Sequence, residues 1–393
     1  MEFEFTEEQQ ILRESLRKFL DAEIRPYDDR HGDEEMTPEL AKQLCKMLIP
    51  WGYLGEGGMF GGRADPIIRA IQTEELACAF PGLAGIAGIT SGAASIVQQG
   101  AHADVAARLA EPLAQADLIG CLAISEPNVG SDPSGIECRA ELKGDRYLVN
   151  GTKCWISNGH IADVAIVLVQ TDPSSGPGGF RQLVIDRSES PFESRDTPTI
   201  GVRSFPTSEL YFRDVEVPAK NRIGGWRDKA KTSSSDEASR AFARVLQSFS
   251  VARVGTGLIA VGIARRAYEL ALEYVVQRKQ FGKEIARFQL VQAMIADMAT
   301  EIDAARLLCY RAQDALSRGR ADVEASMAKA YATEMAVRVT STAIQCMGSN
   351  GLAVENRVER CLRDARMWTM PDGTTQIQKL IIGRALTGMS AIR

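Results

Sequence analysis

Residues 122–132 read L-A-I-S-E-P-N-V-G-S-D, and they stand where the character of the chain changes. Before Leu118 apolar residues recur with helical spacing, beginning at Thr6–Gln9, whose T-E-E-Q pattern is typical of a capping box. After Leu118 short β-branched runs alternate with turn residues. The segment therefore follows a helical first module and opens a β-rich second one.

Four runs in the β-rich module predict strands: RYLVNG, DVAIVLVQT, RQLVID and SELYFRDVEVP. TDPSSGPGG between two of these runs predicts a loop, and the polar stretch 224–238 predicts an exposed linker. Beyond it, periodicity predicts four long helices, over 239–276, 288–317, 322–347 and 375–387. We expect an α+β protein with three domains, residues 1–117, 118–232 and 233–393.

Size and charge limit the classes of function. A chain of 393 residues exceeds what one hydrophobic core normally supports, so two or three packed modules are expected. The net charge of -5 provides no broad positive field, which argues against nucleic acid as a partner. We find no apolar run long enough to span a membrane and no export signal at the start, and therefore expect a cytoplasmic protein without a membrane partner.

Cysteine and histidine usage argues against disulfide and metal chemistry. The 8 cysteines include no C-x-x-C pair, so we expect buried thiols rather than a disulfide framework or a zinc site. None of the 3 histidines has a partner at metal-ligand spacing, and no metal is expected. The Gly-rich stretch 55–62 lacks a flanking strand and helix of the right kind, and we interpret it as an ordinary loop.

Six motifs, in one order over nearly the whole chain, resemble those of the acyl-CoA dehydrogenase family. They are 122–132, K-C-W-I-S-N-G at 153–159, the run 201–218, R-K-Q-F-G-K at 278–283, Q-C-M-G-S-N-G at 345–351, and 362–378 with its P-D-G-T-T-Q-I-Q. The resemblance implies the family fold: an N-terminal helical domain, a middle β-barrel-like domain and a C-terminal four-helix bundle. It also implies a homotetramer, with FAD between the middle and C-terminal domains and its adenine end completed by a neighbouring subunit.

The family reaction removes hydrogens from the carbons α and β to a thioester. It needs a base that takes the α proton and a group that accepts hydride from the β carbon. No protein side chain accepts hydride reversibly, and the resemblance assigns this role to N5 of FAD. By resemblance, three groups of residues bind FAD: Leu122, Ile124, Ser125, Ser131, Trp155 and Ser157 at the flavin ring; Arg278, Gln280, Phe281, Phe288 and Gln289 toward an adjacent subunit; and Gln345, Gly348, Ser349, Thr374 and Gln376 at the diphosphate and adenosine. The implied substrate contacts are Ser131, Phe249, Arg253 and Gly373.

Asp372 is the implied catalytic base. Where the family pattern reads Y-E-G-T, this chain has Pro371, Asp372, Gly373 and Thr374, so a carboxylate is kept but is one methylene, about 1.5 Å, shorter. The other base position known in the family precedes the arginine matched by Arg253, and there the chain has alanine. Burial beside an apolar flavin pocket is expected to raise the pKa of this carboxyl. The structural alternative is an ordinary turn aspartate in P-D-G.

The substrate is less closely defined by these motifs. Ser250 replaces an aspartate that contacts the pantetheine arm in many relatives, and a shorter base suits an α-branched or alicyclic acyl-CoA such as cyclohexanecarboxyl-CoA. Electron-transferring flavoprotein is the implied electron acceptor. Three alternatives remain: a nitroalkane oxidase-like flavoprotein oxidase, which also uses an aspartate base; a dehydrogenase of acyl groups on a carrier protein; and a non-enzymatic flavin-binding adaptor.

Overall fold

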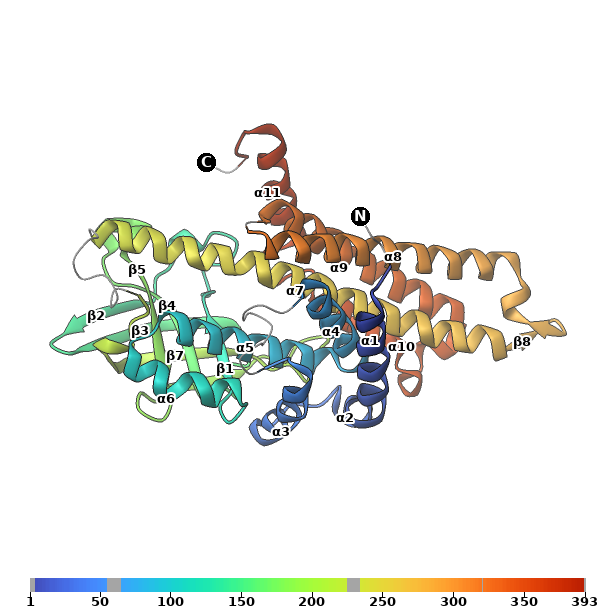
Figure 1. Ribbon diagram of the computed structural model, residues 1–393, viewed down its shortest axis with the longest axis horizontal. Coiled ribbons are helices and arrows are strands. Elements are labelled where there is room, and N and C mark those ends of the chain that lie inside the picture. Colours follow the sequence, from blue (N-terminus) through green and yellow to red (C-terminus); the bar gives the residue numbers. More distant parts are fainter. Residues whose placement is uncertain (1–3, 55–64, 225–233, 320, 392–393) are drawn as a thin grey trace.

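The computed structural model describes residues 4–54, 65–224, 234–319 and 321–391. Short N-terminal helices, a β-sheet and a bundle of long helices follow one another along the chain, as predicted (Figure 1). The sheet lies at one end of the long axis and the bundle extends to the other. The predicted loop at 55–62 and residues 225–233 of the predicted linker lie outside the described residues, and helix α7 already begins at Ser234.

The N-terminal helices cover one side of the sheet and of the bundle. Thr6 and Gln9 form the predicted capping box, with the Gln9 N–H donating to Thr6 Oγ1 at 3.3 Å and the Thr6 N–H donating to Gln9 Oε1 at 3.0 Å. A π-helical turn, Leu20–Ile24, joins the first two helices. The helices are α1 (Glu7–Phe19), α2 (Arg25–His31), α3 (Pro38–Leu48), α4 (Pro66–Ala79), α5 (Pro81–Gly100) and α6 (Ala103–Ala114).

The middle domain is one curved sheet. Its strands are β1 (Gly120–Ala123), β2 (Arg139–Lys143), β3 (Arg146–Ser157), β4 (Val164–Gln170), β5 (Phe180–Asp186), β6 (Glu193–Asp196) and β7 (Thr207–Pro218). They lie in the order β1-β4-β2-β3-β7-β6, with β5 paired to β4. The predicted runs are β3, β4, β5 and β7. TDPSSGPGG is not wholly irregular, because Asp172 accepts from the Ser174 N–H at 3.1 Å and caps a 3-10 segment, Pro173–Gly179.

Strand β4 is buried on both faces, which explains its continuous apolar sequence. Val164 and Ile166 pack in one cluster with residues of α5 and α6, such as Leu109. Ala165 and Val167 belong to a second cluster with β7. All eight cysteines are buried and unpaired, as expected for small apolar residues.

The C-terminal domain contains five helices in the described chain: α7 (Ser234–Gln277), α8 (Gln289–Ser317), α9 (Asp322–Met347), α10 (Val358–Met367) and α11 (Thr375–Thr387). The four predicted helices are present, and α10 is an addition that burial of Val358, Cys361 and Ala365 on one helical face explains. A small hairpin of β8 (Lys279–Gln280) and β9 (Lys283–Glu284) follows α7 and was not predicted. None of the described helices is long and apolar enough to cross a membrane.

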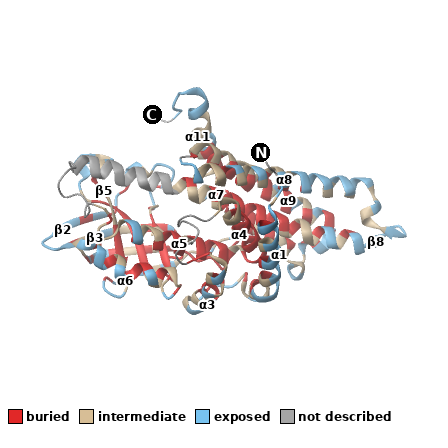
Figure 2. Cartoon of the chain, in the orientation of Figure 1, coloured by how far each residue is buried: buried red, intermediate tan, exposed pale blue. Residues whose placement is uncertain are grey.

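Close packing of α4 against α7 joins the N-terminal helices to the bundle. A Cβ at Gly262 would lie 2.7 Å from the Glu74 carbonyl oxygen, so only glycine permits this approach. Beside it the buried Arg265 donates to Glu74 at 2.9 Å and to Glu75 at 2.6 Å. Figure 2 shows buried residues running from the sheet into the bundle, while the outer side of α8 and the end of α11 are exposed.

Candidate active site

Asp372 lies on the turn between α10 and α11. The turn passes through two consecutive left-handed residues, Asp372 at φ +56° and Gly373 at φ +89°. Aspartate is one of the few residues other than glycine that adopts this conformation readily. The Asp372 carbonyl oxygen accepts from Arg253 Nε at 3.2 Å and from Gln378 Nε2 at 3.0 Å. Side chains of α7 and α11 therefore hold the backbone that carries the carboxylate.

The Asp372 carboxylate has one neutral donor on α7. Thr256 Oγ1 donates to Oδ2 at 2.8 Å, and Arg253 lies one helical turn earlier, so both side chains project from the same face of α7. Burial raises the pKa of Asp372, while the Thr256 hydrogen bond and the charges of Lys329 and Arg253 act in the opposite direction. The net direction is upward, in agreement with the sequence prediction, and brings the carboxyl closer to the pKa of a base that works near neutral pH.

Two of the four predicted substrate residues, Gly373 and Arg253, adjoin Asp372, and a third, Phe249, lies beside Arg253. Gly373 follows Asp372 in the chain, and the guanidinium carbon of Arg253 lies 5.9 Å from the centre of the Phe249 ring. Ser131 instead lies on an exposed loop between β1 and β2. The missing family aspartate has a local counterpart, because Ser250 Oγ donates to Asp322 Oδ1, on α9, at 2.6 Å. A carboxylate thus remains beside Ser250, although it comes from another helix.

The residues predicted at the flavin ring gather on β1, on β3 and on the segment after β1. The Cys154 N–H donates to the Ser125 carbonyl oxygen at 3.0 Å, which sets the two segments side by side. Trp155 is 65% exposed and has φ +58°, at a bulge between Lys153 and Ile156 that turns its indole outward. The half-buried members of the group are Leu122, Ile124, Ser125 and Ser157.

This surface fits an isoalloxazine ring. An exposed indole and two half-buried aliphatic side chains offer apolar contacts, while the serine hydroxyls and strand backbone offer hydrogen bonds to the polar edge of the ring. A strained, outward-facing tryptophan is unusual for a strand that merely fills a core. The residues present therefore suit the cofactor that the sequence motifs imply.

A buried ion pair between Lys153 and Glu126 lies beneath this surface, and the sequence motifs assigned it no role. Lys153 Nζ donates to Glu126 Oε1 at 2.7 Å and to the Ile124 carbonyl oxygen at 2.9 Å. The Glu126 carboxylate also accepts the N–H groups of Glu137, at 2.7 Å, and Cys138, at 2.9 Å. Both residues lie within the quoted motifs, so their place was predictable although their contact was not.

The residues predicted for an adjacent subunit lie at the far end of the bundle, opposite the sheet (Figure 1). Phe281 is 93% exposed at the tip of the β8–β9 hairpin, and its ring contacts that of Phe288 with centroids 6.0 Å apart. Arg278, Gln280 and Gln289 are also exposed there. The end of α9 lies beside them, because Asn350 Nδ2 donates to the Tyr274 hydroxyl of α7 at 2.7 Å. That end exposes Gln345, Gly348 and Ser349.

Thr374 and Gln376 lie apart from that group, next to Asp372. Thr374 Oγ1 accepts from the Ile377 N–H at 3.5 Å and caps α11, and Gln376 is exposed. The predicted cofactor residues therefore occupy three places in one chain: the sheet, the start of α11 and the far end of the bundle.

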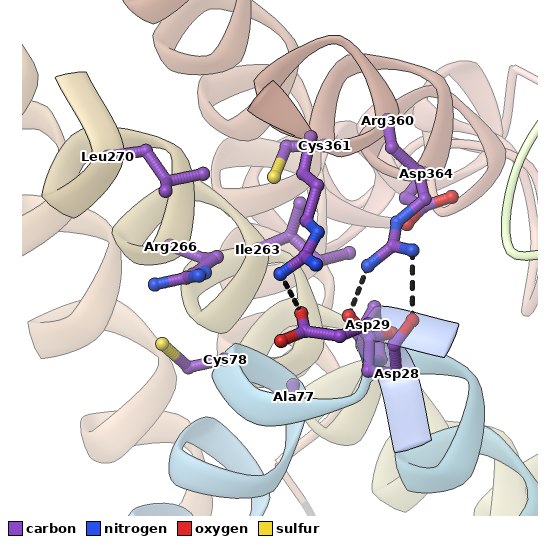
Figure 3. A pocket seen from close by; sticks show the side chains of 12 residues that line it. Asp28, Asp29, Ala77, Cys78, Ile263, Arg266, Leu270, Arg360, Cys361 and Asp364 are labelled. Carbon is purple, nitrogen blue, oxygen red and sulfur yellow. Dashed lines mark hydrogen bonds and ion pairs between the residues drawn. The ribbon is translucent and has the colours of Figure 1, made fainter. Parts of the chain in front are cut away.

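A separate small pocket between α2, α4, α7 and α10 holds paired charges. Figure 3 shows Arg360 facing Asp28, with which it forms an ion pair, and Asp364 nearby on the same helix as Arg360. Burial raises the pKa of Asp364 to about 7. The lining of this pocket includes neither Asp372 nor the side chains that contact it. The Arg360–Asp28 ion pair joins α10 to α2.

Comparison with known sequences decides the family. Models of three domains match successive parts of the chain: acyl-CoA dehydrogenase N-terminal domain over residues 6–117, middle domain over 121–215 and C-terminal domain over 241–387. The chain belongs to the acyl-CoA dehydrogenase family. It is accordingly an oxidoreductase that acts on acyl-CoA. The predicted family and fold are confirmed.

Individual relatives match this acyl-CoA dehydrogenase over almost the full length of the chain. A cyclohex-1-ene-1-carbonyl-CoA dehydrogenase of Syntrophus aciditrophicus is 36% identical, over 98% of this chain and 91% of the relative. The structure of butyryl-CoA dehydrogenase from Megasphaera elsdenii superposes with a TM-score of 0.88 at 31% identity, covering 98% of this chain and 100% of that one. A glutaryl-CoA dehydrogenase from Mycobacterium smegmatis, solved with FADH2, gives 0.85 at 25% identity over 99% and 97% of the two chains. FAD is the cofactor of this enzyme too.

Proposed function

We propose that this enzyme removes hydrogen from carbons α and β of an acyl-CoA, with Asp372 taking the α proton. The observation that carries the proposal is the state of that carboxylate, which is held on a fixed turn, hydrogen-bonded by Thr256 at 2.8 Å and raised in pKa by burial. A carboxylate whose pKa is raised is a stronger base than an ordinary aspartate and accepts a proton more readily. Bound FAD supplies the acceptor for the β hydrogen.

The chain's own groups account for binding and for the proton. Arg253 and Phe249 flank the turn on α7 and form one wall for the acyl thioester. Leu122, Ile124, Ser125, Trp155 and Ser157 hold the flavin ring, while Ser131 serves the thioester arm or the flavin. The α proton passes to the Asp372 carboxylate, and no other acidic side chain is proposed for this step.

We further propose an α-branched or alicyclic acyl group as the preferred substrate. Asp372 reaches about 1.5 Å less far than glutamate, and a ring at the α carbon brings its proton closer to the wall. Similarity to a cyclohex-1-ene-1-carbonyl-CoA dehydrogenase supports this choice. Straight chains, as in butyryl-CoA, leave the α carbon farther from a shortened base.

Anaerobic titration of the FAD-loaded protein tests both proposals. Flavin absorbance is followed while cyclohexanecarboxyl-, butyryl- and octanoyl-CoA are added in separate experiments. We expect bleaching by acyl-CoA substrates, fastest with the alicyclic one, and Asp372→Glu should move the preference toward straight chains. A large advantage of butyryl- or octanoyl-CoA in the wild-type protein would refute the alicyclic preference, and absence of bleaching by every thioester would refute the activity.

Assembly and electron transfer extend the proposal. We propose a homotetramer in which the Phe281 hairpin and Gln345, Gly348 and Ser349 contact the FAD of a neighbouring subunit. The hairpin that contains β8 lies at the opposite end of the chain from β1 and β3, which carry residues proposed at the flavin ring (Figure 1). Sedimentation of the FAD-loaded protein tests the assembly. We propose electron-transferring flavoprotein as the acceptor, and stopped-flow reoxidation tests it. Rapid reoxidation by oxygen and slow reoxidation by that flavoprotein would instead favour an oxidase.

A further inference from the structure

Lys329 is a fully buried lysine on α9 whose ammonium faces the turn that carries Asp372. Its side chain is 0% exposed. Nζ donates to the Thr369 carbonyl oxygen at 2.9 Å and to the Gly373 carbonyl oxygen at 2.7 Å. These two carbonyls bracket Asp372. One ammonium group thus spans the turn from its beginning to the residue after the carboxylate.

A buried ammonium is costly and is retained only where it has partners. A neutral donor could satisfy the same two carbonyls, so the hydrogen bonds alone do not require a charge. The distinguishing feature is the neighbouring anion, because the Gly373 carbonyl that holds the Lys329 ammonium at 2.7 Å directly follows the residue that carries the carboxylate. Each of the two charges accordingly shifts the pKa of the other group toward its ionised form. Burial lowers the pKa of Lys329 to about 8, and the Asp372 carboxylate opposes this decrease. The group is still protonated at neutral pH.

Other polar and charged groups face the turn from each element packed against it. From α7, Arg253 contributes a second positive charge, and its Nε is occupied by the Asp372 carbonyl oxygen rather than the carboxylate. From α9, Glu334 accepts from the Thr375 hydroxyl at 2.6 Å and raises the pKa of Lys329 less than Asp372 does. From α10, Arg366 contacts the Thr369 hydroxyl at 3.3 Å and is exposed. From α11, Gln378 is neutral and bonds only carbonyls in this turn.

We propose that Lys329 is a positioning residue for the base: its ammonium fixes the turn through Thr369 and Gly373 and favours the ionised form of the Asp372 carboxylate. The inference rests on the proposed role of Asp372. It assigns two separable effects to one side chain, a tether that sets where the carboxylate stands and a charge that sets the pH at which it works.

Three substitutions separate the tether from the charge. Lys329→Gln keeps a donor but removes the charge, Lys329→Met removes both at similar volume, and Lys329→Arg keeps the charge. Thr340→Val is the matched control, since Thr340 is also fully buried on α9 but bonds only carbonyls of its own helix. Each FAD-loaded variant is mixed with substrate anaerobically, and the rate of flavin bleaching is measured from pH 5.5 to 9.5, with FAD content and melting temperature as checks.

Loss of the charge should displace the acid limb of the rate profile upward by about one pH unit, as expected for removal of a nearby opposite charge. Below that limb, Lys329→Gln should be about tenfold slower than wild type and should recover at high pH. Lys329→Met should remain slow at every pH, because the turn is no longer held. Lys329→Arg and Thr340→Val should keep the wild-type limb.

An unchanged acid limb in Lys329→Gln would overturn the proposal. So would Lys329 variants that unfold where Thr340→Val is stable, since this would show a role in global stability alone. The base assignment is tested separately by Asp372→Asn, whose failure to abolish bleaching would remove the proposed function regardless of how the Lys329 variants behave.

Discussion

The hydrogen bond from Thr256 to Asp372 should act together with the Lys329 charge in setting the pH at which the enzyme works. Thr256 is 3% exposed, so Thr256→Val removes the hydroxyl at nearly constant shape. A hydrogen bond to a charged group contributes about 1.5–3 kcal/mol, and here it favours the ionised carboxylate. Its loss further raises the pKa of the base, which should move the acid limb of the bleaching rate upward by about one to two pH units.

The sign follows from the chemistry of the base. Only the ionised carboxylate can accept the α proton, so the rate below the limb falls with the ionised fraction. Stopped-flow bleaching of the FAD-loaded protein by saturating acyl-CoA, measured across pH, gives the limb directly. Thr256→Ser keeps a hydroxyl and is the control. A Thr256→Val profile that coincides with wild type would refute the reasoning, as would an equal displacement in Thr256→Ser.

Two further predictions concern stability. Lys153→Met leaves the Glu126 carboxylate buried without its cation and should lower the free energy of unfolding, measured in urea, by about 3–5 kcal/mol. Lys143 forms an exposed pair with Glu141, so Lys143→Met should leave the free energy of unfolding almost unchanged. Equal losses in the two variants would contradict the support role of the buried pair. Asp364, whose pKa burial raises to about 7 from an ordinary 3.8, binds a proton more tightly in the folded state, so stability should fall as pH rises from 4 to 7. Asp364→Asn should lose this part of the pH dependence of the melting temperature while keeping the oxygen that accepts from the Val202 N–H, and an unchanged dependence would count against it.

Much of the fold could be predicted because its signals are local. The bounds of α9 follow from periodicity alone. Strand β4 follows from a short, unbroken apolar run, which is typical of a strand that is buried on both faces. Helix α10 was missed because it is short and its second half overlaps a motif, 362–378, that was interpreted for chemistry rather than periodicity. The β8–β9 hairpin has two residues in each strand, too few for any alternation to appear.

The site was predictable in its motifs and not in its contacts. Asp372 stands in a recognisable sequence slot, and its neighbour Gly373 agrees with a left-handed turn. Thr256 lies 116 residues earlier in the chain, and its contact with the carboxylate follows only from the crossing of α7 and the turn. Lys329 is 44 residues from Gly373, and in the sequence it is one charged residue in a helix with no sign that it is buried. The contact of Asp322 with Ser250 was missed because the two residues are 72 positions apart in the sequence and come together only where α7 and α9 pack.

The most direct test of the account is substrate bleaching of FAD-loaded Asp372→Asn under anaerobic conditions. Asparagine keeps the size of the side chain and its contact with Thr256, but it cannot accept a proton as carboxylate does. The account predicts a yellow protein with normal FAD content that still binds acyl-CoA, with bleaching slower than wild type by about two to four orders of magnitude. Bleaching at the wild-type rate would contradict the claim that Asp372 is the base.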